Sequence, residues 1–165
     1  MTNLNTIWKV WGDVCQCMSN YGITIPPGRE IAARYALVDP MLRALGWDLS
    51  NPMHVRLEWT QAHGLRPDYT FLKNGVPVLY VEAKSWGTIS AIKKLSNPLV
   101  SKELKKLKRY CRCNSVNMGA LTDGGAWYII DFSNLKQPKI TLIDAAKTKT
   151  KHDVKKFLDI SYRAL

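Results

Sequence analysis

The sequence predicts an α/β protein in which a mixed central β-sheet is flanked by α-helices. Two observations support this fold class. Apolar residues recur with helical spacing at both ends of the 165-residue chain and with the spacing of strands in its middle. A further segment of helical period interrupts the strand region, as expected where a helix crosses over between two strands of one sheet.

Two helices are predicted before the strands. Residues 2–19 carry apolar side chains at helical intervals, and so do residues 29–45, which Gly46 terminates. Pro40 lies inside the second segment and cannot donate a main-chain hydrogen bond. We therefore expect a kink there, or a restart of the helix with Asp39 as its N-cap.

The strands are predicted from residue 55 onward, and Lys73-Asn74-Gly75 is a hairpin signal between two of them. A helix at residues 99–113 has an apolar face and a basic face. A final helix is predicted at residues 153–163, after the last strand. The expected strands are residues 55–59, 66–72, 76–83, 118–121, 126–132 and 139–143.

Charge is distributed unevenly along the chain. Residues 1–83 hold seven basic and seven acidic side chains, whereas residues 84–165 hold 17 basic and six acidic ones, so the net charge of +11 lies in the second half. This bias indicates a polyanionic partner, either nucleic acid or an anionic membrane face. A solvated surface that aids solubility is the plainer alternative. The tail adds Lys147, Lys149, Lys151, Lys155 and Lys156, which would give salt-sensitive affinity for any nucleic acid sequence.

Composition disfavours several classes of protein. A chain that is 46% hydrophobic and 22% charged is globular rather than disordered. No stretch approaches the roughly 20 apolar residues of a membrane helix, and residues 1–18 lack the basic start of a signal peptide. We therefore expect a cytoplasmic protein, in the host cytoplasm if the gene is viral. The four cysteines form two C-x-C pairs, a spacing that favours free thiols over structural zinc.

Three charged side chains stand where apolar strands end. Asp68 follows Arg66-Pro67, and Glu82 and Lys84 are two residues apart, so they project from the same face of a strand. Two carboxylates brought together need a cation between them, and a hard ion such as Mg²⁺ prefers oxygen ligands. The alternative is an ion pair at the end of a surface strand.

The loop between the two strands decides whether Asp68 and Glu82 share a face. With a two-residue turn at residues 74–75, Asp68 would point away from Glu82. With a three-residue loop at residues 73–75, Asp68 would lie opposite Tyr80 and become a same-face diagonal neighbour of Glu82. A shared metal site therefore predicts the three-residue loop.

In this order the residues resemble the PD-(D/E)xK nuclease superfamily, in particular the small nuclease domain at the N-terminus of type I restriction enzyme motor subunits. The resemblance implies a restriction-endonuclease-like core at residues 29–132 within a single nuclease domain of residues 1–165. An N-terminal helix would occupy residues 1–28, and a basic strand and helix residues 133–165. The matching motifs are Glu30-x3-Arg34, Leu45-Gly46-Trp47-Asp48, Arg66-Pro67-Asp68-Tyr69 and Val81-Glu82-Ala83-Lys84-Ser85.

The resemblance implies metal-dependent hydrolysis of phosphodiester bonds in DNA. Asp68 and Glu82, helped by the Ala83 carbonyl, would bind Mg²⁺, for which Mn²⁺ can substitute. Lys84 would position or deprotonate the attacking water, and Glu30 would bind or orient a second ion.

Two of these assignments have alternatives. Glu30 lies one helical turn before Arg34 and could instead form a surface salt bridge with it. The family usually has Gln four residues before a Tyr in the helix that follows the site, whereas here Lys106 precedes Tyr110. This departure leaves the role of that position open. Expected nucleic-acid contacts are Lys102, Lys105, Lys106, Arg109 and Arg112 on the basic helix, and Trp86 directly after the site.

The function that these expectations favour is a Mg²⁺-dependent endonuclease acting on DNA. A nuclease acting on RNA is one alternative, and a catalytically silent nucleic-acid-binding or protein-interaction module on the same fold is another. No motor, methyltransferase or target-recognition segment accompanies the motifs. A protein of this size would therefore need to form a homodimer to cut two strands together, or would act on single strands, junctions or ends.

Overall fold

A six-stranded sheet forms the middle layer of the computed structural model, which describes residues 3–21, 29–61, 64–91 and 98–165. Its strands follow their sequence order across the sheet. The third and fourth are parallel and all other neighbours are antiparallel, which confirms the predicted mixed α/β fold class. The strands are β1 (Val55–Leu57), β2 (Tyr69–Lys73), β3 (Val76–Ala83), β4 (Met118–Thr122), β5 (Ala126–Asp131) and β6 (Lys139–Asp144).

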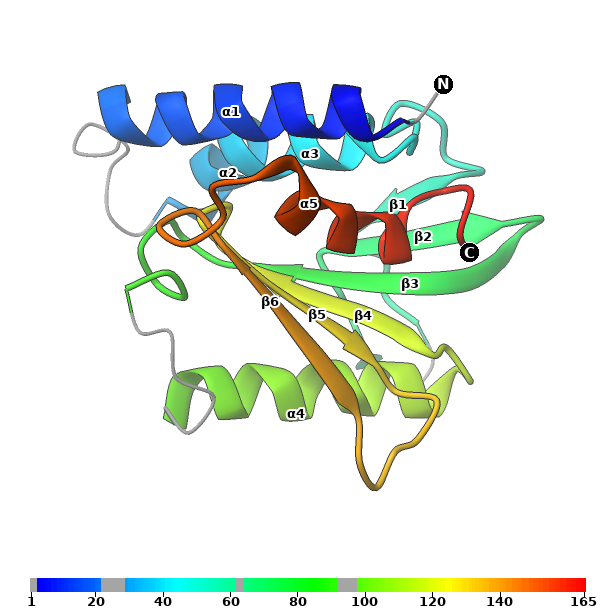
Figure 1. Cartoon of the computed structure of the whole chain (residues 1–165). Coiled ribbons are helices and arrows are strands. Elements are labelled where there is room, and N and C mark those ends of the chain that lie inside the picture. Colours follow the sequence, from blue (N-terminus) through cyan, green and yellow to red (C-terminus); the bar gives the residue numbers. More distant parts are fainter. Residues whose placement is uncertain (1–2, 22–28, 62–63, 92–97) are drawn as a thin grey trace.

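Helices cover both faces of the sheet, and among the described residues α4 (Pro98–Cys113) is the helix that covers one of these faces (Figure 1). Within the part of the chain that the structure describes, no helix is both long and apolar enough to cross a bilayer. The opposite face packs against α1 (Leu4–Tyr21), α2 (Glu30–Ala33), the π-helical η1 (Arg34–Val38), α3 (Asp39–Ala44), α5 (Lys151–Val154) and the 3₁₀-helical η3 (Lys155–Ile160).

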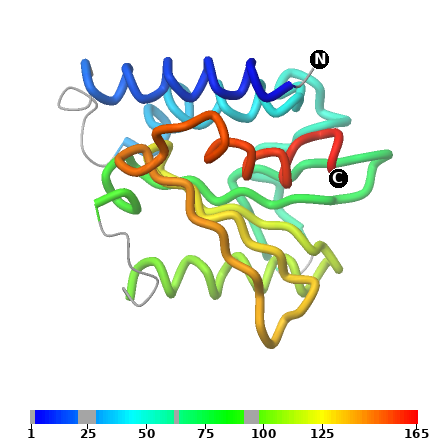
Figure 2. The backbone as a smooth tube through the Cα atoms, in the orientation of Figure 1, coloured from blue at the N-terminus to red at the C-terminus, as the bar shows by residue number. Residues whose placement is uncertain are grey.

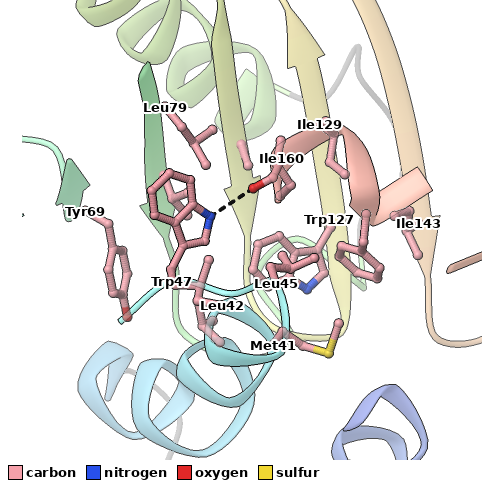
Figure 3. Packing of buried hydrophobic residues seen from close by; sticks show 14 of the residues in the cluster. Met41, Leu42, Leu45, Trp47, Tyr69, Leu79, Trp127, Ile129, Ile143 and Ile160 are labelled. Atoms are coloured by element: carbon pink, nitrogen blue, oxygen red, sulfur yellow. Dashed lines mark hydrogen bonds between the residues drawn. The ribbon is translucent and has the colours of Figure 1, made fainter. Parts of the chain in front are cut away.

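Trp47 and Trp127 lie in the larger of the two hydrophobic cores formed by the described residues (Figure 3). Trp47 packs at 4.6 Å, centroid to centroid, against Phe71 of β2, and its indole N–H donates to the Ile160 carbonyl at 2.9 Å. This bond satisfies a polar atom that burial would otherwise leave unpaired. Trp127 of β5 packs edge-on against Phe157 of η3. The C-terminal segment is thereby fixed to the sheet and to the segment that follows α3.

The hairpin between β2 and β3 corrects one prediction. Lys73 pairs with Val76, so the turn contains two residues, Asn74 and Gly75, both with positive φ (54° and 79°). The expected three-residue loop is therefore wrong. Asn-Gly favours such a two-residue turn because both residues tolerate the left-handed conformation.

A β-bulge in the same hairpin nevertheless places the two acidic residues opposite each other. Leu72 pairs with Pro77 but Phe71 pairs with Leu79, so Val78 is an extra residue in β3. Pro77 has no N–H to donate to the ladder, and prolines within sheets are often found at such irregularities. Beyond the bulge the register is shifted by one residue, and Tyr69 pairs with Val81.

Two helix predictions also need correction. The helix does restart at Asp39, with Pro40 in its first turn, but after a π-helical segment and without a side-chain cap. The Asp39 carboxylate instead accepts a 2.6 Å hydrogen bond from the Tyr69 hydroxyl. The C-terminal helix is also shorter than expected, because α5 has only four residues and continues as the 3₁₀ helix η3 up to Ile160.

The helix α4 lies between β3 and β4 in the sequence and beneath the sheet in space (Figure 2). Leu107 and Tyr110 of α4 pack in the same core as Tyr80 of β3. Side chains two residues apart on a strand share a face, so Glu82 also projects toward α4. The end of β3 that carries Glu82 therefore lies next to α4.

Candidate functional site

Asp68 and Glu82 lie opposite each other at the end of the β2–β3 hairpin. Tyr69 pairs with Val81, so one step further along the antiparallel ladder Asp68 faces Glu82. The Asp68 carboxylate accepts a 2.7 Å hydrogen bond from the Ala83 main-chain N–H. The Glu82 side chain is buried, with 1% of the residue's surface exposed. The hairpin thus brings two carboxylates to one end of the sheet.

Lys84 lies among three carboxylates. Its Nζ atom is 2.9 Å from Glu82 Oε1, 3.3 Å from Glu103 Oε2 of α4 and 3.9 Å from Glu30 Oε2 of α2. Its side chain is 17% exposed. Burial would lower the pKa of Lys84, but its negatively charged neighbours, Glu82 first, raise that pKa above the usual value. Lys84 is therefore held as an ammonium ion beside Glu82.

Glu82 has a second basic partner in Lys106. The Lys106 ammonium donates to the same Oε1 atom as Lys84 and lies 5.6 Å from the centre of the Tyr110 ring. The other oxygen, Oε2, is buried and accepts no hydrogen bond from the residues that the structure describes. One oxygen of Glu82 is thus bonded twice and the other lacks a donor.

Both carboxyl groups have a raised pKa. For Asp68, burial raises the pKa and the negative charge of Glu30 adds to the rise, while the Ala83 N–H opposes it. For Glu82, burial and the charge of Asp68 raise the pKa, and Lys84 opposes the rise. The two acids repel each other and are partly dehydrated, so a positive charge between them would stabilise the site.

Glu30 and Arg34 do not form the salt bridge that their spacing allowed. Arg34 instead bonds Glu58 at 3.0 Å and the Tyr69 hydroxyl at 3.2 Å, while Glu30 faces Lys84. Glu58 also pairs with Arg66. The Arg34–Glu58 pair ties η1 to the segment after β1 and leaves the Glu30 carboxylate turned toward the site.

The residues at this site fit a hard divalent ion that retains several waters. Within the described ranges, no three carboxylate, imidazole or thiolate side chains are grouped closely enough to enclose a metal. Mg²⁺, however, is commonly bound through one or two carboxylates together with water and substrate phosphates. Asp68 and Glu82 supply two carboxylates, and the free buried Oε2 of Glu82 offers a lone pair without a donor. The donor set therefore suits Mg²⁺ or Mn²⁺.

The expected nucleic-acid contacts separate into three groups. Lys106 turns inward and pairs with Glu82. Trp86 is half-buried, packs against the larger core and lines a cavity with Cys15 and Met18 of α1. The remaining four form the exposed basic face of α4, namely Lys102, Lys105, Arg109 and Arg112.

Glu103 is a site residue that none of the sequence motifs includes. It occupies the apolar stripe of α4, three residues after Val100 and four before Leu107, and all three are buried. A carboxylate on an apolar helix face is costly unless it has a partner. That signal was present in the sequence, but the partner, Lys84, becomes evident only when α4 is packed on the sheet.

Comparison with known proteins identifies the family. Residues 54–138, half of the chain, match the model of the family described as type I restriction enzyme R protein N terminus. The chain belongs to this family, so it is a restriction-enzyme-related nuclease domain. No curated protein matches the chain.

One solved structure with a detectable similarity is a fragment of a putative HsdR subunit of a type I restriction enzyme from Vibrio vulnificus YJ016. The match has 18% sequence identity and a TM-score of 0.44, and covers 79% of this chain. The chain spans only 25% of the length of that fragment.

Proposed function

We propose that the domain is a Mg²⁺-dependent endonuclease that hydrolyses phosphodiester bonds in DNA. The observation that carries this proposal is the pair of opposed carboxylates, Asp68 and Glu82, with a buried oxygen that has no donor and the Lys84 ammonium 2.9 Å from the other oxygen. Membership in a restriction enzyme family supports a nuclease rather than another use of this constellation.

The chemistry divides among a few groups. When bound, a divalent ion would neutralise phosphate charge and make a water more acidic. Asp68, Glu82 and the Ala83 carbonyl would hold this ion, and Glu30 would hold or orient a second one. Lys84 would position the attacking water and stabilise the negative charge that accumulates on the phosphate. Without a bound ion, the neighbouring carboxylates, Glu82 first, raise the pKa of Lys84 and keep it a cation.

The substrate would approach along the exposed basic face of α4. Lys102, Lys105 and Arg109 point to solvent on the helix that also carries Glu103 and Lys106 into the site. Lysine and arginine contacts to phosphates position a strand without reading its sequence. The proposal is therefore a nuclease whose substrate choice depends more on shape than on base sequence. A homodimer would allow cutting of both strands of a duplex.

The test is a cleavage panel. Labelled single-stranded, duplex and branched DNA, and RNA, are incubated with the protein in Mg²⁺, Mn²⁺ or EDTA. We expect metal-dependent cleavage of at least one DNA that falls about 100-fold or more in Asp68→Ala and Lys84→Ala. Asp159→Ala and Lys139→Ala remove the same charges from exposed positions on η3 and β6 and serve as controls.

One observation favours a second candidate, a catalytically silent binding module. The Lys106 ammonium bonds the carboxylate that the nuclease needs for its metal, at a position where the family usually has Gln. This candidate predicts binding of nucleic acid that is unchanged in EDTA and in Asp68→Ala, with no cleavage of any substrate in the panel. Metal-dependent cleavage of RNA alone would assign the RNA nuclease instead.

A further inference from the structure

Lys84 and Lys106 both bond Glu82, but they are held very differently. Lys84 is 17% exposed and lies within 4 Å of three carboxylates. Lys106 is 42% exposed, and among the described residues it contacts Glu82 and the ring of Tyr110. Moving Lys84 away would leave three acids without their shared cation, whereas Lys106 can leave by rotating into solvent. Lys106 is thus the displaceable partner of Glu82.

The position of Lys106 on α4 gives it an alternative partner. It lies three residues after Glu103, which is buried, and directly after Lys105, which is exposed. Lys106 therefore sits at the border between the face of α4 that contacts the sheet and the basic face that points to solvent. A long, flexible lysine at such a border can place its ammonium on either side. A phosphate bound to the exposed basic face of α4 would lie on the side to which Lys106 would turn.

We infer that Lys106 is a displaceable counter-ion of Glu82 that couples nucleic-acid binding to divalent-cation binding at this site. This inference rests on the proposed function. An ammonium at Glu82 Oε1 competes with a divalent cation for the same carboxylate and repels it. A phosphate backbone on α4 offers Lys106 a new partner and frees Glu82 for the metal. The metal would then bind tightly only when nucleic acid is present.

The coupling must be reciprocal. If nucleic acid increases the affinity for metal by some factor through Lys106, metal increases the affinity for nucleic acid by the same factor. Couplings of this kind commonly amount to about 5-fold to 150-fold. Direct contact between phosphate and metal contributes to the factor as well, and it persists when Lys106 is replaced. The share due to Lys106 is therefore the difference between the wild type and a Lys106 variant.

The first measurement is the affinity for Mn²⁺ without nucleic acid, by titration calorimetry. We expect Lys106→Gln to bind Mn²⁺ at least about 5-fold more tightly than the wild type, and Lys106→Arg, which keeps the charge, to resemble the wild type. Lys108→Gln is the matched control. Lys108 is on the same helix but lines a cavity with Ile130 and Phe132, away from Glu82. Its loss should leave the affinity for Mn²⁺ unchanged.

The second measurement is the affinity for a fluorescent duplex in EDTA and in Ca²⁺, by anisotropy. The dissociation constant in EDTA divided by that in Ca²⁺ should be smaller for Lys106→Gln than for the wild type. For Lys108→Gln this ratio should equal that of the wild type. Equal Mn²⁺ affinity in Lys106→Gln and the wild type, or an equal gain in Lys108→Gln, would overturn the inference.

A further variant separates this inference from the proposed function. Saturable Mn²⁺ binding that Asp68→Ala abolishes, with no effect of Lys106→Gln, would overturn the coupling but leave the metal site standing. Absence of saturable Mn²⁺ binding in both the wild type and Lys106→Gln would overturn both.

Discussion

The ionised carboxylate of Asp68 lowers the stability of the folded domain. Burial raises its pKa, so between the unfolded and the folded pKa the folded protein binds more protons than the unfolded chain. Stability therefore falls as pH rises through this window, and the loss persists at higher pH. The Ala83 N–H bonds the carboxylate but does not abolish the penalty. Such a cost is expected where function, rather than stability, requires the side chain.

Replacing Asp68 by Asn should therefore stabilise the protein at neutral pH. Asn keeps an acceptor for the Ala83 N–H but carries no charge. We expect a higher free energy of unfolding for Asp68→Asn than for the wild type at pH 7, measured by urea unfolding in EDTA. The difference should shrink at pH 4, where more of the wild-type carboxyl is protonated.

Asp131→Asn is the control with the opposite sign. Hydrogen bonds from Ser133 lower the pKa of Asp131, so its charged form is the stabilising one, and that contribution disappears as pH falls through the folded pKa. This variant should lose stability at pH 7 and approach the wild type at low pH. If Asp68→Asn is less stable than the wild type at pH 7, burial of the Asp68 carboxylate does not destabilise the folded domain.

The sequence identified some site residues and not others for a physical reason. Asp68, Glu82 and Lys84 belong to one hairpin, and local strand geometry relates them. Glu103 and Lys106 reach the site only because α4 packs across the same face of the sheet. Which side chain of a helix meets which strand depends on that packing, and periodicity within the helix does not specify it.

At the scale of elements, the β2–β3 hairpin places Asp68 and Glu82 on one face as predicted, but through a different loop and a bulge. The turn is one residue shorter than predicted, which alone would have placed Asp68 and Glu82 on opposite faces. The bulge at Val78 restores the common face. Asn74-Gly75 signalled the short turn and Pro77 the irregularity, but the sequence does not say that the two shifts cancel.

The turn between β4 and β5 shows how tightly another element docks. Gly124 has a φ of 86°, and a Cβ atom there would lie 2.9 Å from Leu37 Cδ1 of η1 and closer still to Leu37 Cβ. Asp123 fixes the same turn by accepting main-chain hydrogen bonds from Gly125, Ala126, Ile89 and Ser90. The turn therefore joins η1 to the segment that follows Lys84.

Gly124→Ala should destabilise the domain by about 1–3 kcal/mol, because the left-handed backbone and the contact with Leu37 both oppose a side chain. Chemical denaturation would measure the loss. Gly12→Ala is the matched control, since Gly12 is exposed in α1 and a Cβ there meets nothing within 4 Å. That variant should gain up to about 1 kcal/mol from helix propensity. A neutral Gly124→Ala would refute the tight docking.

At the scale of the whole molecule, the excess of positive charge does not form one surface. The basic face of α4 lies on one side of the sheet, whereas α5 and η3, which carry Lys151, Lys155 and Lys156, pack on the other side (Figure 1). The sequence located this charge in the second half of the chain. In the structure, α4 lies on one side of the sheet and the C-terminal helices lie on the other, so the basic residues of the second half are divided between two layers.

The site lies where three layers meet, with Glu30 from the helical layer, Asp68, Glu82 and Lys84 from the sheet and Lys106 from α4. The central claim of the proposed function is that a divalent ion binds at this meeting point, next to the Ala83 N–H that holds Asp68.

Paramagnetic broadening of amide NMR signals by Mn²⁺ tests this claim most directly, and the mass of 18.7 kDa suits the method. At low Mn²⁺ the amides of Tyr69 and residues 82–84 should broaden first in the wild type and stay sharp in Asp68→Ala. Broadening centred elsewhere, or broadening of the same amides in Asp68→Ala, would contradict a metal site built on Asp68 and Glu82.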